Sequence, residues 1–482
     1  MPQIGLVTMR ARRGESLHAL ALRLRRRPDV VSVEVERRHR PRLVPDDPAL
    51  TAPEMGSGAT SGVAVQWWAA RENLFSAWDV STGEGALVAV IDTGIDRRHP
   101  DLASRVAGTI NLDPRHVNGR GMADTQGHGT HVASLACATG DNGIGMVGAG
   151  YRCSLLVIKS DLSDSSVAEA IVVATDRGAD AINMSFGNSS SSQPPTALVR
   201  AVAYAYRHGV TMVAAAADSP VLQQGDPANL LQPTGTGRDI GAGKGLSVTA
   251  ANFSDERAPF AGRGSQISMA AYGSFSSARG GPRGIFGAFP AQLAGLETGS
   301  AGGPCFCRTT FAGDNRYAYV QGTSMAAPQV AAIAALAHHL NPDLSAGDVI
   351  RILKRTARRP SGTAWGPELG WGILDGGAAL NAARALDRTR PVSRLQVPRR
   401  VGNRQIALRW TGSDASPRGV ASSGVAAYEV WRQVGDGPAR RITSTTATQT
   451  TVAATPGERY RFFTIAVDRA GNRERPPKVT SP

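Results

Sequence analysis

The sequence predicts an α/β fold with a doubly wound, mostly parallel sheet, preceded by a small α+β segment and followed by an antiparallel β-sandwich. Three observations support this prediction. Between about residues 66 and 386, apolar runs of strand length alternate with helix-like segments, as they do when helices cover both faces of a sheet. Residues 391–482 hold short β-rich runs separated by polar and glycine-rich turns, the pattern of a sandwich of roughly 90 residues. Residues 1–45 offer one helix and one strand, a fragment of a small unit.

The N-terminal region contains two predicted elements and a connector. The leucine spacing in residues 17–24 suits a short helix, and residues 30–36 (VVSVEVE) alternate apolar and polar side chains like a half-exposed strand. Residues 51–62 are rich in Gly, Ser and Thr, which indicates a flexible connector or an exposed cleavable loop. We therefore expect residues 46–65 to link residues 1–45 to the main domain.

Four strands are predicted in the main domain, because continuous apolar runs are typical of strands buried on both faces. They are ALVAVI, SLLVIK, ADAINMSF and HGVTMVAAAA, at residues 86–91, 154–159, 179–186 and 208–217. A helix is predicted between two of them, at residues 167–178. In the C-terminal domain the predicted strands are RQIALRW, AAYEVWRQ and RYRFFTIAV.

Composition narrows the function classes. The formal net charge is +14, but only four of the 53 basic residues are lysines. This arginine excess indicates a coding bias, and no aromatic side chains alternate with the N-terminal arginines, so nucleic acid is not an expected partner. No apolar run approaches the ~20 residues of a membrane helix, and the first residues lack the apolar stretch of a signal peptide. The cysteines match no zinc spacing and leave open one or two disulfides or buried free thiols; they are Cys137, Cys153, Cys305 and Cys307.

Three polar residues lie where predicted core elements begin or end. Asp92 follows the strand 86–91, at the end where open α/β sheets bind ligands. His128 lies among glycines at a helix start, where the helix dipole lowers its proton affinity and keeps it available as a base. Ser324 precedes an apolar helix with Pro328 in its first turn, where backbone N–H groups are free. Taken alone, each of these three residues also fits the role of an ordinary cap or turn residue. Together they are the parts of an acyl-transfer triad.

Two competing kinds of site find less support. His131 lies one turn after His128, but no third ligand accompanies the pair, so a metal site is not expected there. Asp92, Thr93 and Gly94 also match the aspartic protease signature, but that chemistry needs a second such acid. The chain has no other Asp-Thr-Gly or Asp-Ser-Gly. The chain order Asp, His, Ser differs from that of chymotrypsin and of the α/β-hydrolases.

The blocks DTGID, GHGTHVA and GTSMAAP, in this order, resemble the three signature blocks of the subtilisin-like serine proteases. The resemblance covers about residues 66–386. It implies a subtilisin-like fold, a serine endopeptidase that acts on polypeptides through an acyl-enzyme, and a triad of Asp92, His128 and Ser324. The INMSFG stretch resembles the family's substrate-binding strand, which pairs with the peptide as an added strand. The implied substrate-binding residues are Ser185, Phe186, Gly187, Ala215, Ala216 and Ala217.

The N-terminal fragment resembles the end of the family's inhibitory propeptide. This similarity implies a self-processed precursor whose own propeptide is a partner, with the maturation site expected between Pro45 and Gln66. Only the second half of a propeptide is recognisable, so we expect the true start, with any signal peptide, to lie upstream.

One position departs from the family pattern. Where subtilisins read approximately VVAAAGN, this chain reads MVAAAAD, so Ala217 and Asp218 replace a glycine and an asparagine. In the family this asparagine donates a hydrogen bond to the oxyanion, beside the nucleophile that Ser324 would be here. An ionised aspartate cannot donate, so only a protonated Asp218 can take that role. Some related prohormone-processing proteases also carry Asp here, so we expect an active enzyme that is slower at alkaline pH than a subtilisin.

The resemblance also implies one structural Ca²⁺. The matching side-chain ligands are Asp101 and Asn142, and the matching carbonyls are those of Gly140, Ile144 and Met146. The alternative is a glycine-rich turn that binds no ion.

The remaining expectations concern the whole chain. We expect a secreted monomer without a membrane span. The C-terminal segment resembles a fibronectin type III or related sandwich, which serves as a spacer or a binder in secreted enzymes. The alternative is that the chain is a proteolytically weak subtilase relative and acts mainly as a binding protein. Asp218 is the one feature that favours this alternative.

Overall fold

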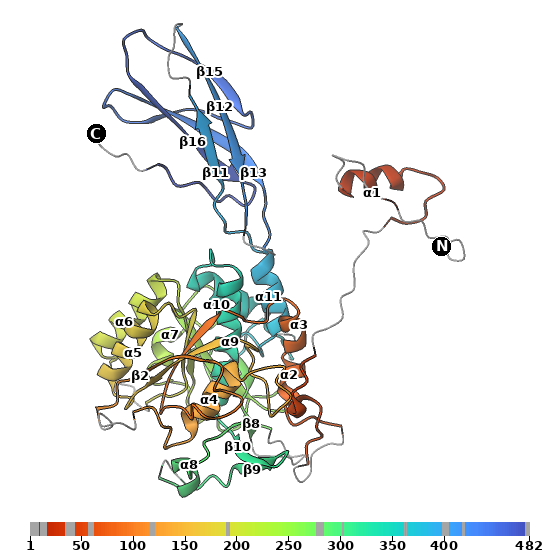
Figure 1. Cartoon of the computed structure of the whole chain (residues 1–482), viewed down its shortest axis with the longest axis vertical. Helices are drawn as coiled ribbons and strands as arrows, with labels where there is room; N and C mark the ends of the chain where they lie inside the picture. The colour runs from red at the N-terminus through yellow and green to blue at the C-terminus, as the bar shows by residue number, and fades with distance from the viewer. Residues whose placement is uncertain are drawn as a thin grey trace. The chain divides into compact units, whose positions relative to one another are not determined.

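The structure is a computed structural model, and Figure 1 shows its course from the N-terminus to the C-terminus. It describes residues 9, 17–33, 44–55, 62–114, 121–188, 193–275, 284–300, 303–360, 362, 364–397, 404–416 and 420–477. The chain divides into two units, Met1–Leu43 and Val44–Pro482. Within the described ranges, no helix combines the length and the apolar character that crossing a membrane requires.

The first unit contains the predicted helix but not the predicted strand. Helix α1 spans Leu17–Arg25, as the leucine spacing predicts. Residues 30–33 are not in a strand, so the prediction is wrong there, and residues 34–36 lie outside the described part. A β-strand needs a neighbour for its backbone N–H and C=O groups, and a short alternating sequence does not supply one.

The second unit is built on a seven-stranded sheet in which all paired strands are parallel. The strand order is β2-β3-β1-β4-β5-β6-β7. The strands are β1 (Leu87–Asp92), β2 (Val106–Asn111), β3 (Ser154–Lys159), β4 (Ala181–Met184), β5 (Thr211–Ala215), β6 (Gly245–Ala251) and β7 (Met269–Tyr272). Of the first five strands, all except β2 match apolar runs that the sequence predicted. The predicted α/β class is confirmed.

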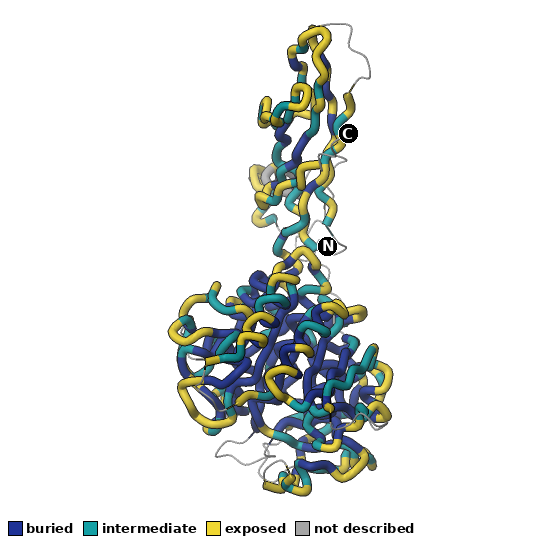
Figure 2. Tube along the Cα trace, turned by 90° about the vertical axis from the view of Figure 1, so that its left-hand side faces the viewer, coloured by how far each residue is buried: buried dark blue, intermediate teal, exposed yellow. Residues whose placement is uncertain are grey.

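Helices cover both faces of this sheet. On one face α5, α6 and α7 share an apolar core with β1, β3, β4 and β5; on the other, α4 and α9 pack together and against the central strands. Figure 2 shows the sheet region as the most continuously buried part of the chain. The helices are α2 (Trp67–Arg71), α3 (Leu74–Trp78), α4 (His128–Cys137), α5 (Asp164–Asp176), α6 (Thr196–Arg207), α7 (Ala228–Leu231), α8 (Gly295–Thr298), α9 (Thr323–Leu340), α10 (Ala346–Thr356) and α11 (Gly376–Ala385).

Helix α9 starts earlier than predicted. It begins at Thr323, so Pro328 lies in its second turn and not in the first. Proline has no N–H, so Pro328 cannot donate to the Ser324 carbonyl as an interior helical residue would. The Ser185 hydroxyl donates to that carbonyl instead, at 2.8 Å. The proline is therefore tolerated because a residue at the end of β4 supplies the missing hydrogen bond.

Much of the region expected to be a linker belongs to the second unit and packs within it. Residues 48–50 form a short 3₁₀ helix in which Ala49 and Leu50 are buried. The Ala49 N–H donates to the Gly145 carbonyl at 3.0 Å, and Gln66 exchanges hydrogen bonds with the backbone of Val147. Buried apolar side chains and these hydrogen bonds thus hold this stretch in place. The Gly/Ser/Thr-rich composition gave no indication of this packing.

The described part of the second unit contains three smaller sheets besides the main one. Strands β8 (Ile285–Ala288), β10 (Asp314–Val320) and β9 (Arg308–Phe311) form one antiparallel sheet. The C-terminal part contains two antiparallel sheets, ordered β11-β12-β15 and β14-β13-β16. Their strands are β11 (Val392–Gln396), β12 (Gln405–Ser413), β13 (Val425–Val434), β14 (Arg440–Thr445), β15 (Gln449–Ala453) and β16 (Tyr460–Asp468). The predicted antiparallel β-structure is confirmed, and its likeness to fibronectin type III stays a prediction.

Both cysteine pairs form disulfides, Cys137–Cys153 and Cys305–Cys307. The sequence left these pairings open, because spacing alone does not determine connectivity.

Candidate active site

The candidate site lies where the strand order of the main sheet reverses. Strand β1 is flanked by β3 and β4, although β2 follows it along the chain. Ligands bind at the carboxyl ends of strands at such a reversal. Asp92 is the last residue of β1 and Ser185 directly follows β4, so both predicted residues lie at this point.

Asp92 and His128 are hydrogen-bonded to each other. Asp92 is 1% exposed, and its Oδ1 lies 2.8 Å from Nδ1 of His128. An ionised carboxylate only accepts hydrogen bonds, so the imidazole donates from Nδ1 and leaves Nε2 as an acceptor. The Thr93 N–H also donates to this Oδ1, at 2.7 Å. The arrangement holds the ring in the tautomer that a general base requires.

His128 is the first residue of α4, and two glycines let this helix approach β1. A Cβ atom on Gly129 would lie 2.3 Å from the Gly94 carbonyl oxygen, a distance that forbids any side chain. Gly94 itself has φ 120°, a conformation that L residues rarely adopt. The glycines of the two blocks are thus required by one close contact between the strand end and the helix start.

The pKa of His128 is raised, which corrects the expectation that the helix dipole lowers its proton affinity. Burial of the imidazole acts to lower the pKa, but the charge and hydrogen bond of Asp92 outweigh it, and Asp124 and Asp218 add to the effect. Three acids near one histidine therefore outweigh both burial and the helix start. A raised pKa means that the imidazolium is stabilised relative to that of an ordinary histidine, which helps a base that must hold a proton during a reaction.

Asp124 organises the loop before α4, and the sequence analysis did not identify it. Its Oδ1 accepts hydrogen bonds from the Thr93 hydroxyl and from the N–H groups of Gln126 and Gly127. Its Oδ2 accepts from the N–H and the hydroxyl of Thr130. An acid a few residues before a helix start was the available signal. Asp124 ties the strand-end turn to the first turn of α4.

We expect Asp124→Ala to lower the free energy of unfolding by about 3 kcal/mol, because five donors lose a buried ionised acceptor. The exposed Asp164 in the first turn of α5 is the control, and its alanine variant should lose no more than about 0.5 kcal/mol. Urea unfolding of both variants, in a Ser324→Ala background to prevent self-digestion, measures the difference. A loss below about 1 kcal/mol for Asp124→Ala contradicts the assignment.

Ser324 lies in the first turn of α9 and is 9% exposed. Its hydroxyl donates to the Ser185 carbonyl at 2.9 Å, while the Ser185 hydroxyl donates to the Ser324 carbonyl. Among the residues that the structure describes, no hydrogen bond joins Ser324 to His128. The structure thus brings Asp92 to His128, and it orients the Ser324 hydroxyl toward β4.

The predicted substrate-binding residues lie beyond the last paired residues of β4 and β5. The two strands pair as far as Met184 and Ala214. After them Ser185 is buried, Phe186 packs partly against the core, and Gly187 is exposed. On the other side Ala215 and Ala216 are buried and Ala217 is half-buried.

The loop that contains Gln224 and Asp226 contacts both segments through hydrogen bonds. The Ala217 N–H donates to Oε1 of Gln224 at 2.9 Å, and the Asn188 N–H donates to the Asp226 carbonyl at 3.1 Å. Residues 224–226 therefore bridge the segments that follow β4 and β5.

Asp218 is exposed and contacts the start of α9. Its Oδ1 accepts hydrogen bonds from the Thr323 N–H at 2.7 Å and from the Thr323 hydroxyl at 2.9 Å. A negative charge is favoured at a helix N-terminus, where backbone N–H groups are free. Asp218 acts as an acceptor here, and its Oδ2 lies toward Gly322.

The predicted calcium ligands lie around one buried acid. Asp101 is 0% exposed, and its oxygens accept hydrogen bonds from the Asn142 amide, the Met146 N–H and the Tyr317 hydroxyl. Burial raises the pKa of Asp101 to about 6. Two further predicted ligands, the carbonyls of Gly140 and Ile144, belong to the loop that carries Asn142.

Two acids from the expected linker join this loop. Asp47 is 1% exposed and its Oδ2 accepts from the Asp141 N–H, while Asp46 accepts from the Gly143 N–H. The buried Oδ1 of Asp47 has no hydrogen-bond partner. Burial also raises the pKa of Asp47 to about 6. The oxygen donors, the buried acids and this unpaired oxygen fit a Ca²⁺ ion, and Asp47 is a candidate ligand that the sequence analysis missed.

Comparisons with known proteins agree with this geometry. The model of the subtilase family of peptidases matches residues 83–372. Thermitase of Thermoactinomyces vulgaris is 30% identical over 295 residues, which are 60% of this chain and 86% of thermitase. Subtilisin DY of Bacillus licheniformis is 32% identical over 281 residues, which are 57% of this chain and 84% of that protein.

Two further similarities cover more of the chain. An extracellular protease of Xanthomonas campestris is 29% identical over 397 residues, which are 74% of this chain and 60% of that protein. Among solved structures, a protease from Pseudoalteromonas arctica is similar with a TM-score of 0.53 and 26% identity. That similarity covers 70% of this chain and 99% of the other.

Proposed function

Because this chain belongs to the subtilase family and is a serine endopeptidase, we propose that it cleaves polypeptides through an acyl-enzyme on Ser324. His128 is the general base, and Asp92 orients it. The observation that supports this assignment best is the 2.8 Å hydrogen bond between His128 Nδ1 and the buried Asp92 carboxylate. It leaves Nε2 of His128 free to accept the proton of a serine hydroxyl.

In the proposed reaction the Ser324 hydroxyl leaves the Ser185 carbonyl and donates to Nε2 of His128. The oxygen attacks the peptide carbonyl as its proton passes to the imidazole, and the imidazolium then protonates the leaving amine. Water, activated by the same imidazole, releases the acyl group. The interactions with nearby acids that raise the pKa of His128 also stabilise the imidazolium in both steps.

The acyl-enzyme predicts a burst. On mixing with a p-nitrophenyl ester, we expect a rapid release of about one equivalent of p-nitrophenol per chain, followed by slower turnover. Stopped-flow absorbance measures the burst, and it should be absent in His128→Ala. A strictly linear release from the unaltered chain, at substrate concentrations that saturate it, contradicts an accumulating acyl-enzyme.

For the oxyanion we propose two donors, the Ser324 N–H and a protonated Asp218. Thr323 occupies Oδ1 of Asp218, so the proton would reside on Oδ2, which lies toward Gly322. A carboxyl group can accept with one oxygen and donate with the other only when it is protonated. We therefore propose that catalysis at this site weakens at pH values where Asp218 is ionised.

For the substrate we propose pairing with the backbone of Ser185, Phe186 and Gly187 as an added strand. The N–H groups of Ala216 and Ala217 already donate to Val248 and Gln224, so the run Ala215–Ala217 forms a wall and not a pairing edge. Its small side chains favour an apolar residue in the adjoining pocket.

We propose a calcium site at Asp101, Asn142 and Asp47, with carbonyl oxygens from Gly140, Ile144 and Met146. The ion would be structural, and it would balance the buried carboxylates that the loop gathers. Because Asp47 belongs to the N-terminal stretch, this site would also fasten that stretch to the sheet.

We expect removal of Ca²⁺ by EGTA to lower Tm by about 10 °C, since an ion at 1,000 times its Kd stabilises by about 4 kcal/mol. Calorimetry of the Ser324→Ala chain measures this shift. In Asp101→Asn this shift in Tm should be smaller. In Asp436→Asn, which changes an exposed turn, the shift should equal that of the unaltered sequence. An unchanged shift in Asp101→Asn contradicts the site.

We propose that the precursor processes itself, with the first unit as its propeptide. Asp46, Asp47 and Ala49 are hydrogen-bonded to the loop 141–145, which supports the proposal that these residues remain in the mature enzyme. We therefore expect cleavage on the N-terminal side of Asp46, and N-terminal sequencing of the active form measures it. The Ser324→Ala chain should remain uncleaved, and a mature form that begins at Thr51 or later contradicts the assignment.

We also propose that the enzyme is secreted and acts as a monomer. Two disulfides fit an oxidising compartment, and the Xanthomonas relative is named an extracellular protease.

A further inference from the structure

Three carboxylates from separate segments gather near the start of the C-terminal sheets. Asp387 follows α11, Asp414 follows β12, and Asp468 is the last residue of β16. One oxygen of each acid lies within 4.8 Å of an oxygen of each of the others. Asp387 and Asp468 are 7% and 2% exposed, and Asp414 is half-buried. Three carboxyl groups are thus held together, two of them buried and one half-buried.

No arginine or lysine forms an ion pair with these acids within the part of the chain that the structure describes. Arg388 follows Asp387 in sequence, but its guanidinium pairs with Asp348 at 2.9 Å. Arg469 follows Asp468, but it donates to the Ser423 carbonyl. Carboxylates this close repel one another unless a positive charge lies between them. The two nearest arginines in sequence do not provide that charge.

One oxygen of the cluster has no hydrogen-bond partner. Oδ1 of Asp414 is inaccessible to solvent and accepts no hydrogen bond, while Oδ2 accepts from the Gly424 N–H and the Ser422 hydroxyl. Buried carboxylate oxygens are almost always satisfied by a donor or a metal ion. This unpaired oxygen is an observation separate from the gathering of acids, and it points to a cationic ligand.

The other two acids are held firmly by backbone donors. Asp387 accepts from the Thr389 and Ser423 N–H groups through its two oxygens. Asp468 accepts from both the N–H and the side-chain amide of Asn472. Each oxygen keeps a second lone pair, so these bonds orient the carboxylates without using up their capacity to bind a metal.

We propose that Asp387, Asp414 and Asp468 bind one Ca²⁺ ion, which fastens the end of α11 to the loops that follow β12 and β16. The donors are all oxygen, and a hard divalent cation balances most of their charge. Ca²⁺ suits the irregular geometry of three loops better than Mg²⁺, which demands a near-ideal octahedron. The site shares no residue with the Asp101 loop and does not depend on the catalytic assignment.

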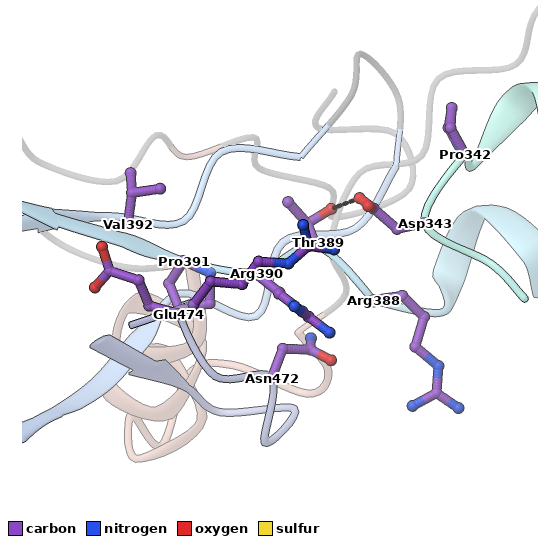
Figure 3. A pocket seen from close by; sticks show the side chains of 10 residues that line it. Pro342, Asp343, Arg388, Thr389, Arg390, Pro391, Val392, Asn472 and Glu474 are labelled. Carbon is purple, nitrogen blue, oxygen red and sulfur yellow. Dashed lines mark hydrogen bonds between the residues drawn. The ribbon is translucent and has the colours of Figure 1, made fainter. Parts of the chain in front are cut away.

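A cleft gives such an ion a way in. It has a volume of about 680 Å³ and is lined by Arg388, Thr389 and Asn472 among others, and Figure 3 shows the Thr389 hydroxyl donating to Asp343 across it. Asn472 also donates to Asp468 and to the Asp387 carbonyl. Two of the three acids, Asp387 and Asp468, therefore adjoin residues that line the cleft.

Metal content of the full chain tests this proposal. Ser324→Ala protein is dialysed against buffered Ca²⁺, and bound Ca²⁺ per chain is measured for it and for added Asp414→Asn or Asp468→Asn. The exposed Asp436→Asn is the control, and Asp101→Asn identifies the other site. We expect each cluster variant to lose one Ca²⁺ per chain, or to bind it at least tenfold more weakly, and the double variant with Asp101→Asn to lose both. Stoichiometry and affinity equal to those of Asp436→Asn overturn the proposal.

A second measurement needs no change to the cluster. In the Ser324→Ala chain, Ca²⁺ should slow hydrogen exchange in the peptides that contain Ser423, Gly424 and Asn472, whose N–H groups donate to the three acids. The same slowing should persist in Asp101→Asn and should be weaker with Mg²⁺. Equal exchange in these peptides with Ca²⁺ and with EGTA overturns the proposal even if the cluster variants fail to fold.

Discussion

Replacing Ser324 by alanine is expected to lower kcat/KM for an unstructured protein such as casein by roughly 10⁴- to 10⁶-fold. Alanine removes the nucleophile and leaves only the rate enhancement that binding and oxyanion stabilisation provide. We expect the first turn of α9 to tolerate this change, because the Ser324 hydroxyl makes one hydrogen bond to the described residues, to the Ser185 carbonyl. Far-UV circular dichroism and Tm should therefore stay close to those of the unaltered chain.

Ser345 is the matched control for this variant. It is also a serine at a helix start, and its side chain accepts the Asp348 N–H as an ordinary N-cap of α10. We expect Ser345→Ala to lose about 1 kcal/mol of stability and none of its kcat/KM. If Ser324→Ala behaves like Ser345→Ala, Ser324 is a cap and not a nucleophile. The runner-up function, a weak relative that binds polypeptides, would then account better for the chain.

The second large effect is expected from Asp218→Asn. Asparagine keeps an oxygen that accepts from Thr323 and adds an N–H₂ group that donates at every pH. We expect kcat/KM for casein to rise by about 10² above pH 8, since one oxyanion donor is worth roughly that factor. Rates of the two proteins from pH 5 to 10, with Asp436→Asn as a control of equal charge change, measure the gain.

The same substitution should leave the acidic limb of the pH profile in place. His128 must be neutral to accept the serine proton, so activity rises as pH passes its pKa. A charged Asp218 raises this pKa, but the proposed donor carries a proton at these pH values, so Asp218→Asn removes no charge there. A limb that shifts to lower pH in Asp218→Asn, but not in Asp436→Asn, would mean that Asp218 is ionised in the active enzyme and is not the donor. An alkaline rate within about twofold of the unaltered chain would mean that Asp218 does not face the oxyanion.

Local patterns predicted the parts of the fold that depend on local physics. Continuous apolar runs identified β1, β3, β4 and β5, because strands buried on both faces have no polar side to show. The sequence showed glycines around His128 but not their purpose, which is the close contact between Gly129 and Gly94. Asp92 and His128 meet because the end of β1 and the start of α4 lie at the same edge of the sheet.

The features that the sequence did not predict depend on contacts between distant segments. Asp47 joins a loop almost a hundred residues away in the chain, and the composition around it resembles a linker. The orientation of the Ser324 hydroxyl is set by Ser185, and the tolerance of Pro328 by the same residue. The acids at Asp387, Asp414 and Asp468 each look like an ordinary turn residue until folding brings them together.

Covalent labelling of the purified chain with a fluorophosphonate tests the assignment of the nucleophile, since the oxygen of an activated serine attacks the phosphorus of such reagents and displaces fluoride. We expect one label per chain by intact mass, located on Ser324 by peptide mapping, with labelling abolished in His128→Ala and retained in Ser345→Ala. A chain that hydrolyses casein but takes no label, or takes it on another residue, would contradict the assignment of Ser324 as the nucleophile.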